Sequence, residues 1–246
     1  SRAYKKINPK VVVPVLLHKG VPIYDSWDII RHLDTYAPSQ GTSLLPKTAE
    51  GQQALNEQVL ENALRSDIPL GGNFGTSIAG ASTYILANIL KRRPALAVIW
   101  DYLTKHPDPM RKVAFCVLRL RGGLPKPLYE KFIKQLALGL TVCEQRLSDG
   151  RAYMFGDYTM LDVMMTAHLH RLEDVHLDGI LSAEKLPHLA AYWQRVQARP
   201  SYKPAMTDQH SWEWRAAIDA VYKGQPSPFL PLLESQLAKA TTPNKT

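Results

Sequence analysis

The order of apolar and polar positions predicts a β-hairpin followed by a helix near the start of the chain. Residues 11–17, VVVPVLL, form a mainly β-branched apolar run of the kind that builds a buried strand. A turn at Gly20 and a second short apolar run at residues 21–24 complete the hairpin pattern. From Ser26 the apolar positions recur at helical spacing, at Trp27, Ile29, Ile30 and Leu33.

The rest of the chain is helical in pattern almost throughout. Residues 37–48 are rich in Pro, Gly, Ser and Thr, which predicts a linker. Two or more helices are expected within residues 76–121, where RRP and KHPDP interrupt the pattern. Further helices are expected at residues 49–65, 128–147, 159–172 and 187–198.

This layout predicts the α+β fold class. A small α/β piece at residues 1–36 is joined by the linker to an all-helical domain at residues 49–210. We expect the remaining tail, residues 211–246, to pack on or near the helical domain.

Pro14 stands out because it lies within the first apolar run. Proline donates no hydrogen bond to a β-ladder and is rare in central strands. One interpretation is a cis proline, which bends the chain at the head of the hairpin. The alternative is a trans proline on an edge strand.

The Asp25–Ser26 step opens the predicted helix. The Ser26 hydroxyl and the first free N–H groups point to one place, where the helix dipole favours a carboxylate. Asp25 could accept a hydrogen bond from an ammonium group. Together they suit the α-amino-carboxylate head of a γ-glutamyl peptide such as glutathione, with Lys5 or Lys10 reaching the other carboxylate. The alternative is that Ser26 is only an N-cap, worth about 1 kcal/mol.

Three stretches resemble the cytosolic glutathione transferase superfamily. NPKVVVPVLLHKGVPIYDSWDIIRHLD is similar to its Asn-Pro, Val-Pro, hairpin and acidic-Ser pattern, although a Gly common shortly after Asn-Pro is absent. YMFGDYTMLDVMMTAHLHRL is similar to its Gly-Asp-x-Thr-x-x-Asp motif, and LPHLAAYWQRVQARPSY continues the likeness. The resemblance omits residues 70–125 and the chain after residue 210. Within the superfamily the tetrachlorohydroquinone dehalogenase-like subgroup looks most similar.

The resemblance implies a thioredoxin-like N-terminal domain, which as supplied lacks the first β-α-β, and a helical C-terminal domain. It implies glutathione as co-substrate, bound by Lys10, Val13, Pro14, Asp25 and Ser26. The backbone of Val13 would pair with the extended peptide as an added strand. The family's catalytic Tyr, Ser or Cys is expected upstream of Ser1, because it ends the first strand.

Further properties are expectations from the same resemblance. These are a cytoplasmic homodimer, a role in detoxification, and a second-substrate pocket in the helical domain. The candidates for the pocket wall are Asn73, Phe74, Tyr84, Tyr102, His168 and Trp212, with Trp214 as the alternative to Trp212.

Thr159 and Asp162 predict a capping box, with Asp in the place of the usual Glu. We therefore interpret Asp162 as structural rather than catalytic. The histidines at 168, 170 and 176 do not share one helical face, so no metal site is expected. Cys116 and Cys143 have neither a disulfide framework nor metal-ligand spacing.

Positive charge is concentrated in one segment. The chain has 246 residues and a net charge of +8. Residues 88–127 carry nine Lys or Arg and two Asp, interleaved with apolar residues. The preferred interpretation is a solvated face of an enlarged helical domain; contact with an anionic membrane and steering of anionic substrates are the alternatives. No stacking or base-reading motif indicates nucleic acid.

The predicted function is a glutathione-dependent transferase that uses the thiolate to attack a hydrophobic, aromatic or halogenated electrophile. The alternative is a non-catalytic transferase-like adaptor that contacts a membrane or a protein through the basic segment. No run of apolar residues reaches the length of a membrane span.

Overall fold

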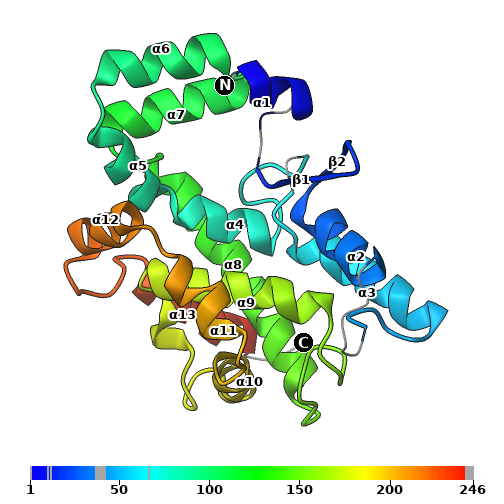
Figure 1. The fold of residues 1–246 in the computed structure, drawn as a ribbon. Coiled ribbons are helices and arrows are strands. Elements are labelled where there is room, and N and C mark those ends of the chain that lie inside the picture. Colours follow the sequence, from blue (N-terminus) through cyan, green and yellow to red (C-terminus); the bar gives the residue numbers. More distant parts are fainter. Residues whose placement is uncertain (1, 10, 12, 37–42, 66, 242–246) are drawn as a thin grey trace.

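A computed structural model describes residues 2–9, 11, 13–36, 43–65 and 67–241 of the chain (Figure 1). Its N-terminal part contains helix α1 (Arg2–Ile7), strands β1 (Val15–His18) and β2 (Val21–Tyr24), and helix α2 (Ser26–Tyr36). The two strands pair antiparallel, with Val15 opposite Tyr24. A small sheet beside a mainly helical chain confirms the predicted α+β class.

The turn of the hairpin is formed by Lys19 and Gly20, both with positive φ (50° and 82°). This is the backbone that a two-residue hairpin turn requires, and glycine adopts it without strain. The strand expected at residues 11–17 begins only at Val15, so Pro14 precedes the ladder instead of interrupting it. The Val13–Pro14 peptide bond is cis, as one of the two interpretations predicted.

The helical part follows the predicted pattern closely, and its breaks fall at the expected RRP and KHPDP sites. Asp108 caps the helix after the second break by accepting from the amides of Met110 and Arg111. Two 3-10 turns also occur, η1 (Asp178–Ile180) and η2 (Thr207–Gln209). The helices are α3 (Ala49–Asn62), α4 (Phe74–Ala81), α5 (Thr83–Lys91), α6 (Ala95–Lys105), α7 (Pro109–Arg121), α8 (Lys126–Leu147), α9 (Met160–Asp174), α10 (Pro187–Gln197), α11 (Tyr202–Ala205), α12 (Trp212–Tyr222) and α13 (Leu230–Thr241).

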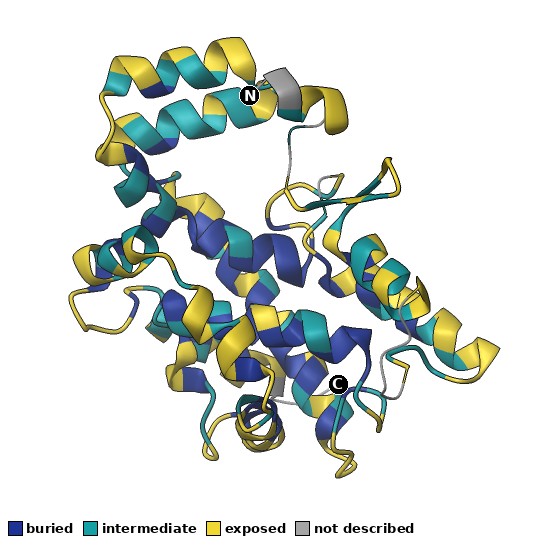
Figure 2. Cartoon of the chain, in the orientation of Figure 1, coloured by how far each residue is buried: buried dark blue, intermediate teal, exposed yellow. Residues whose placement is uncertain are grey.

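The main core lies where α4, α8 and α9 meet, and these helices carry the densest buried positions in Figure 2. Helices α4 and α8 approach closely because Gly139 on α8 leaves room for the Phe74 ring; a Cβ there would clash with it. Trp27 of α2 joins the same core, which anchors the N-terminal helix to the helical domain. The position of α2 is therefore fixed by burial of apolar surface.

Helix α9 begins at the predicted capping box. The Asp162 carboxylate accepts from the Thr159 amide (2.8 Å) and hydroxyl (2.9 Å). It also accepts from the Met154 amide and the Tyr192 hydroxyl, both at 3.0 Å. Asp162 is fully buried, so this one carboxylate joins α9, α10 and the preceding loop.

The basic segment forms the hairpin of α6 and α7. Helices α5, α6 and α7 share a second small core made of Ala87, Leu90, Val98 and Leu118. Other apolar side chains of the hairpin face outward, including Leu96 and Trp100, which are 83% and 69% exposed. The preferred interpretation was a solvated face whose apolar side packs on neighbouring helices. Such packing occurs for only part of the segment.

The described part of the tail, residues 211–241, contains helices α12 and α13. Helix α12 packs against α5, and α13 packs against α8 with Leu233 and Leu237 buried. Within the part of the chain that the structure describes, no helix combines the length and hydrophobicity needed to cross a bilayer.

Candidate functional site

Two cavities meet at the N-terminus of α2. One, of about 500 Å³, lies between the Val13–Pro14 turn and the α6–α7 hairpin. The other, of about 480 Å³, lies between α2, α4, α5 and α9. Asp25 and Ser26 line both cavities, so a ligand held at this helix end would border each of them.

The helix start itself differs in one detail from the sequence interpretation. The Asp25 carbonyl accepts from the Ile29 amide (3.0 Å), which places Asp25 at the N-cap and Ser26 at the first helical position. Ser26 therefore follows the cap position instead of occupying it, and its role in binding a ligand stays a prediction. Asp25 adopts φ 68°, Ser26 is exposed, and both residues line the two cavities.

The first cavity brings together four of the five expected glutathione contacts. Val13, Pro14, Asp25 and Ser26 all line it, and the Val13 side chain is 80% exposed. Lys10 lies outside the described residues. The segment before β1 thus lies beside a helix N-terminus, which is an arrangement that suits a peptide bearing a carboxylate.

The opposite wall of this cavity is cationic, which the sequence interpretation did not assign to particular residues. It contains Arg65, His106 and Arg111, together with Leu64, Tyr102 and Phe115. Arg65 binds Asp67 through two bonds, at 3.0 and 2.9 Å, and Arg111 lies 3.4 Å from Asp108. Burial, with Arg111 nearby, lowers the pKa of His106. The two guanidinium groups are the wall's permanent cations among the described residues, and each is paired with a nearby carboxylate.

The second cavity is mainly apolar. His168 at its wall donates its Nε2 hydrogen to the Asn62 carbonyl (2.8 Å), and burial lowers the pKa of the ring to about 4. Because the ring is neutral at pH 7, His168 adds no charge to the cavity wall. The other side chains at the wall include Trp27, Ile30, Ile78, Met164, Met206 and Trp214.

A cationic group, Arg171, also borders the apolar cavity. The Arg171 guanidinium lies over the Trp214 ring at 4.3 Å and pairs with Asp174 at 2.8 Å. Burial lowers the pKa of Arg171, and Asp174 counteracts part of that effect. Stacking on tryptophan and pairing with a carboxylate both hold the guanidinium in place.

The structure distributes the expected pocket residues over different environments. His168 lines the apolar cavity and Tyr102 lines the cationic one. Asn73 instead caps α4 and donates to the carbonyls of Leu60 and Ala63.

The remaining expected residues lie away from both cavities. Phe74 is buried in the core, and Tyr84 stacks on Tyr129 with ring centroids 4.3 Å apart. Trp212 is 70% exposed, whereas Trp214, the alternative, lines the apolar cavity.

Comparison with known protein families gives matches in both the N-terminal part and the helical part of the chain. Residues 1–35 match the glutathione S-transferase N-terminal domain, and residues 126–195 match the glutathione S-transferase C-terminal domain. Protein LigF of Sphingobium sp. strain SYK-6 is 24% identical over 207 residues, covering 81% of this chain and 75% of LigF.

Two solved structures share the fold. The crystal structure of the β-etherase LigF from the same strain has a TM-score of 0.71 at 20% identity, covering 85% of this chain and 83% of LigF. The Tau class glutathione S-transferase of mango, Mangifera indica, has a TM-score of 0.56 at 19% identity, covering 89% of this chain and 80% of that protein. The solved structures show the shared fold. The matches to both glutathione S-transferase domains, together with the similarity to LigF, place the chain in the cytosolic glutathione transferase superfamily.

Proposed function

We propose that this glutathione-dependent transferase holds the γ-glutamyl head of glutathione at the start of α2 and transfers the thiol to a hydrophobic electrophile in the apolar cavity. The observation that carries the proposal is that Asp25 and Ser26 line both cavities. A tripeptide anchored there can extend along Val13 while its thiol borders the electrophile site.

Each end of glutathione has a chemically suited partner in this arrangement. The amides at the start of α2 and the Ser26 hydroxyl favour the γ-glutamyl carboxylate, and the Asp25 carboxylate suits the ammonium group. Arg65 and Arg111 lie on the opposite wall, where the glycyl carboxylate of an extended peptide would end. Arginine suits that role because its planar fork matches a carboxylate.

The electrophile class follows from the apolar cavity and its rings. Apolar and aromatic side chains favour an aromatic compound, and among the described residues that line the cavity Arg171 supplies a cation able to stabilise an anionic leaving group. LigF is named a β-etherase, so displacement of a phenolate from an aryl ether by the glutathione thiolate is the reaction we propose first. Displacement of a halide is the runner-up, because the same thiolate attack applies.

Thiolate formation is the step that we assign to no residue in the described part of the chain. A thiol with a pKa of ~8.5 needs a nearby donor or positive charge to ionise at neutral pH. Activity measurements on the native full-length protein, with aryl ethers, aryl halides and glutathione, test the proposed reaction. Release of a phenol that requires glutathione supports it, and turnover of none of these electrophiles refutes it.

Replacing Ser26 by alanine is expected to raise the KM for glutathione at least several-fold, with little change in kcat or in the unfolding temperature. The change removes one hydrogen bond to a charged group, worth roughly 1.5–3 kcal/mol. Ser148→Ala, an exposed serine at the end of α8, is the matched control. An unchanged KM in Ser26→Ala would remove Ser26 from the glutathione site.

A second candidate function is peripheral membrane contact through the α6–α7 hairpin. Leu96, Trp100 and Leu103 are exposed and lie at i, i+4 and i+7, so they form one apolar stripe on α6. Basic residues flank this stripe, which is the pattern of helices that lie on anionic lipid surfaces.

Flotation with vesicles tests this second function. The protein is expected to float with anionic vesicles at low salt, and Trp100→Ser is expected to weaken binding roughly tenfold, because one inserted tryptophan contributes a few kcal/mol at most. Trp212→Ser is a matched control, since Trp212 is 70% exposed but lies on α12. Equal binding to neutral vesicles, or equal loss in both variants, would contradict an α6–α7 membrane surface.

A further inference from the structure

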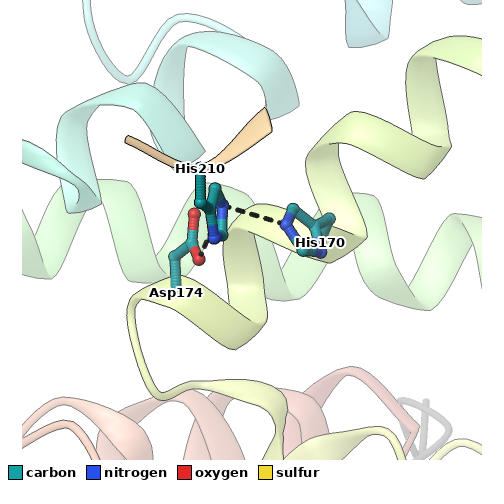
Figure 3. Close-up of side chains that lie close together, drawn as sticks. All are labelled: His170, Asp174 and His210. Carbon is teal, nitrogen blue, oxygen red and sulfur yellow. Dashed lines mark hydrogen bonds and ion pairs between the residues drawn. The ribbon is translucent and has the colours of Figure 1, made fainter. Parts of the chain in front are cut away.

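Three side chains with metal-ligand chemistry converge behind the apolar cavity (Figure 3). His170 and Asp174 lie one turn apart on α9, and His210 follows η2. The Nε2 atoms of the two histidines are 3.1 Å apart, and His210 Nε2 lies 3.4 Å from Asp174 Oδ1. One ligand atom from each residue lies within 4.8 Å of the others.

These separations match the geometry of a coordination shell. Zinc–nitrogen and zinc–oxygen bonds of about 2.0–2.1 Å place neighbouring ligands of a tetrahedral ion about 3.3 Å apart. The His170–His210 and His210–Asp174 pairs are already near that value. A small adjustment of His170 and Asp174 would bring the third pair to the same separation. We propose that His170, Asp174 and His210 form a binding site for a divalent transition-metal ion, with Zn²⁺ as the expected occupant.

The outer contacts of His170 orient it as a ligand. Its Nδ1 lies 2.9 Å from the Tyr202 hydroxyl and 3.3 Å from Glu173 Oε2. Glu173 is in turn held by Trp193 Nε1 and Gln197 Nε2, both donating at 2.8 Å to its Oε1. A carboxylate behind a histidine fixes the ring and leaves the Nε2 lone pair for a metal.

The outer contacts of Asp174 likewise orient its carboxylate as a metal ligand. Its Oδ2 accepts from Arg171 (2.8 Å) and from Trp214 Nε1 (3.1 Å). Oδ1 therefore remains on the side of the two imidazoles, where the only facing partner in the described structure is His210. The carboxylate is buried, so a bound cation would offset part of its desolvation.

The donor set favours particular metals. Two neutral imidazoles and one carboxylate suit Zn²⁺, Co²⁺ or Ni²⁺, whereas Mg²⁺ and Ca²⁺ favour oxygen ligands. Three protein ligands leave a position for water, and the His210 side chain is 19% exposed, which gives an entry path. The competing interpretation is a proton shared between the two histidine nitrogens, with no metal.

Metal binding is expected to hold one wall of the apolar cavity in place. Asp174 also holds Arg171 and Trp214, which border the apolar cavity. A metal ion would tie the segment between η2 and α12 to α9 and would thereby fix this cavity wall. The proposal does not depend on the identity of the electrophile.

The sequence expectation of no metal site considered only the histidines at 168, 170 and 176. The spacing His170–Asp174 does place both on one face of a helix, and this was the available signal. The third ligand is 36 residues after Asp174, as their sequence positions show, and only the fold brings it there.

A cobalt titration of chelator-treated, purified protein tests the proposal with the metal alone. We expect one Co²⁺ per chain, with visible absorption typical of four or five ligands, and displacement by Zn²⁺. His210→Gln is expected to weaken binding at least tenfold, since one of three ligands is lost. Glu173→Gln is expected to weaken binding about 10- to 100-fold through the orientation of His170.

The matched control is His32→Gln. The His18–His32 pair, with ring nitrogens 2.6 Å apart, is a second imidazole pair in the described structure. Zn²⁺ should also raise the unfolding temperature of the wild type and of His32→Gln but not that of His210→Gln, which shows that the variant folds and lacks the site. Absence of cobalt binding, equal binding in His210→Gln, or loss in His32→Gln would each overturn the proposal.

Discussion

Replacing Asp162 by alanine is expected to lower the free energy of unfolding by about 3–5 kcal/mol. Its buried carboxylate accepts four hydrogen bonds, from two backbone amides and from the hydroxyls of Thr159 and Tyr192. Removing it leaves buried donors without a partner, which costs far more than the net value of each bond. Urea denaturation of the wild type and the variant measures the difference.

Asp219→Ala is the matched control for this change. Asp219 is exposed on α12, so its loss should alter the free energy of unfolding by no more than about 0.5 kcal/mol. A similarly small change in Asp162→Ala would contradict a structural role for the capping box. It would also reopen the possibility that Asp162 serves chemistry.

The stability of the protein is expected to fall by about 3 kcal/mol between pH 6.5 and pH 4 because of His168 alone. Burial lowers the pKa of His168 from 6.5 to about 4. Between these values the unfolded chain binds a proton that the folded chain does not, so this contribution is complete above pH 6.5 and is lost as the pH falls to about 4.

The measurement compares urea denaturation at pH 7 and pH 4.5 for the wild type, His168→Gln and His188→Gln. Glutamine cannot titrate and can still donate to the Asn62 carbonyl. The free energy of unfolding of His168→Gln should therefore depend less on pH than that of the wild type. His188 is exposed and should leave the wild-type dependence unchanged. The same pH dependence in all three proteins would contradict the buried, neutral state of His168.

The elements that local pattern determines were predicted well. The hairpin, α2 and the capping box depend on residues close in sequence, so spacing and residue type suffice. The predicted start of β1 was too early because residues 11–13 are as apolar as a strand, whereas the ladder begins only after Pro14, at Val15.

The walls of the cavities could be predicted only in part, because they depend on packing between distant segments. Arg65 lies in the loop after α3 and Arg111 in α7, and nothing in their local pattern indicates that they share a cavity with Val13. Trp212 and Trp214, in contrast, are close in sequence but do not share a cavity. They are two residues apart, so the helix places them on different faces. Sequence alone gave no ground for choosing between them.

Calorimetric titration with glutathione tests the central claim most directly. The native full-length protein is titrated with glutathione and, separately, with cysteinylglycine, which lacks the γ-glutamyl head expected at Asp25 and Ser26. We predict one glutathione site per chain and at least about tenfold weaker binding of cysteinylglycine, since the contacts of a charged head are lost. No binding of glutathione, or equal affinity for both peptides, would contradict the placement of glutathione at the start of α2.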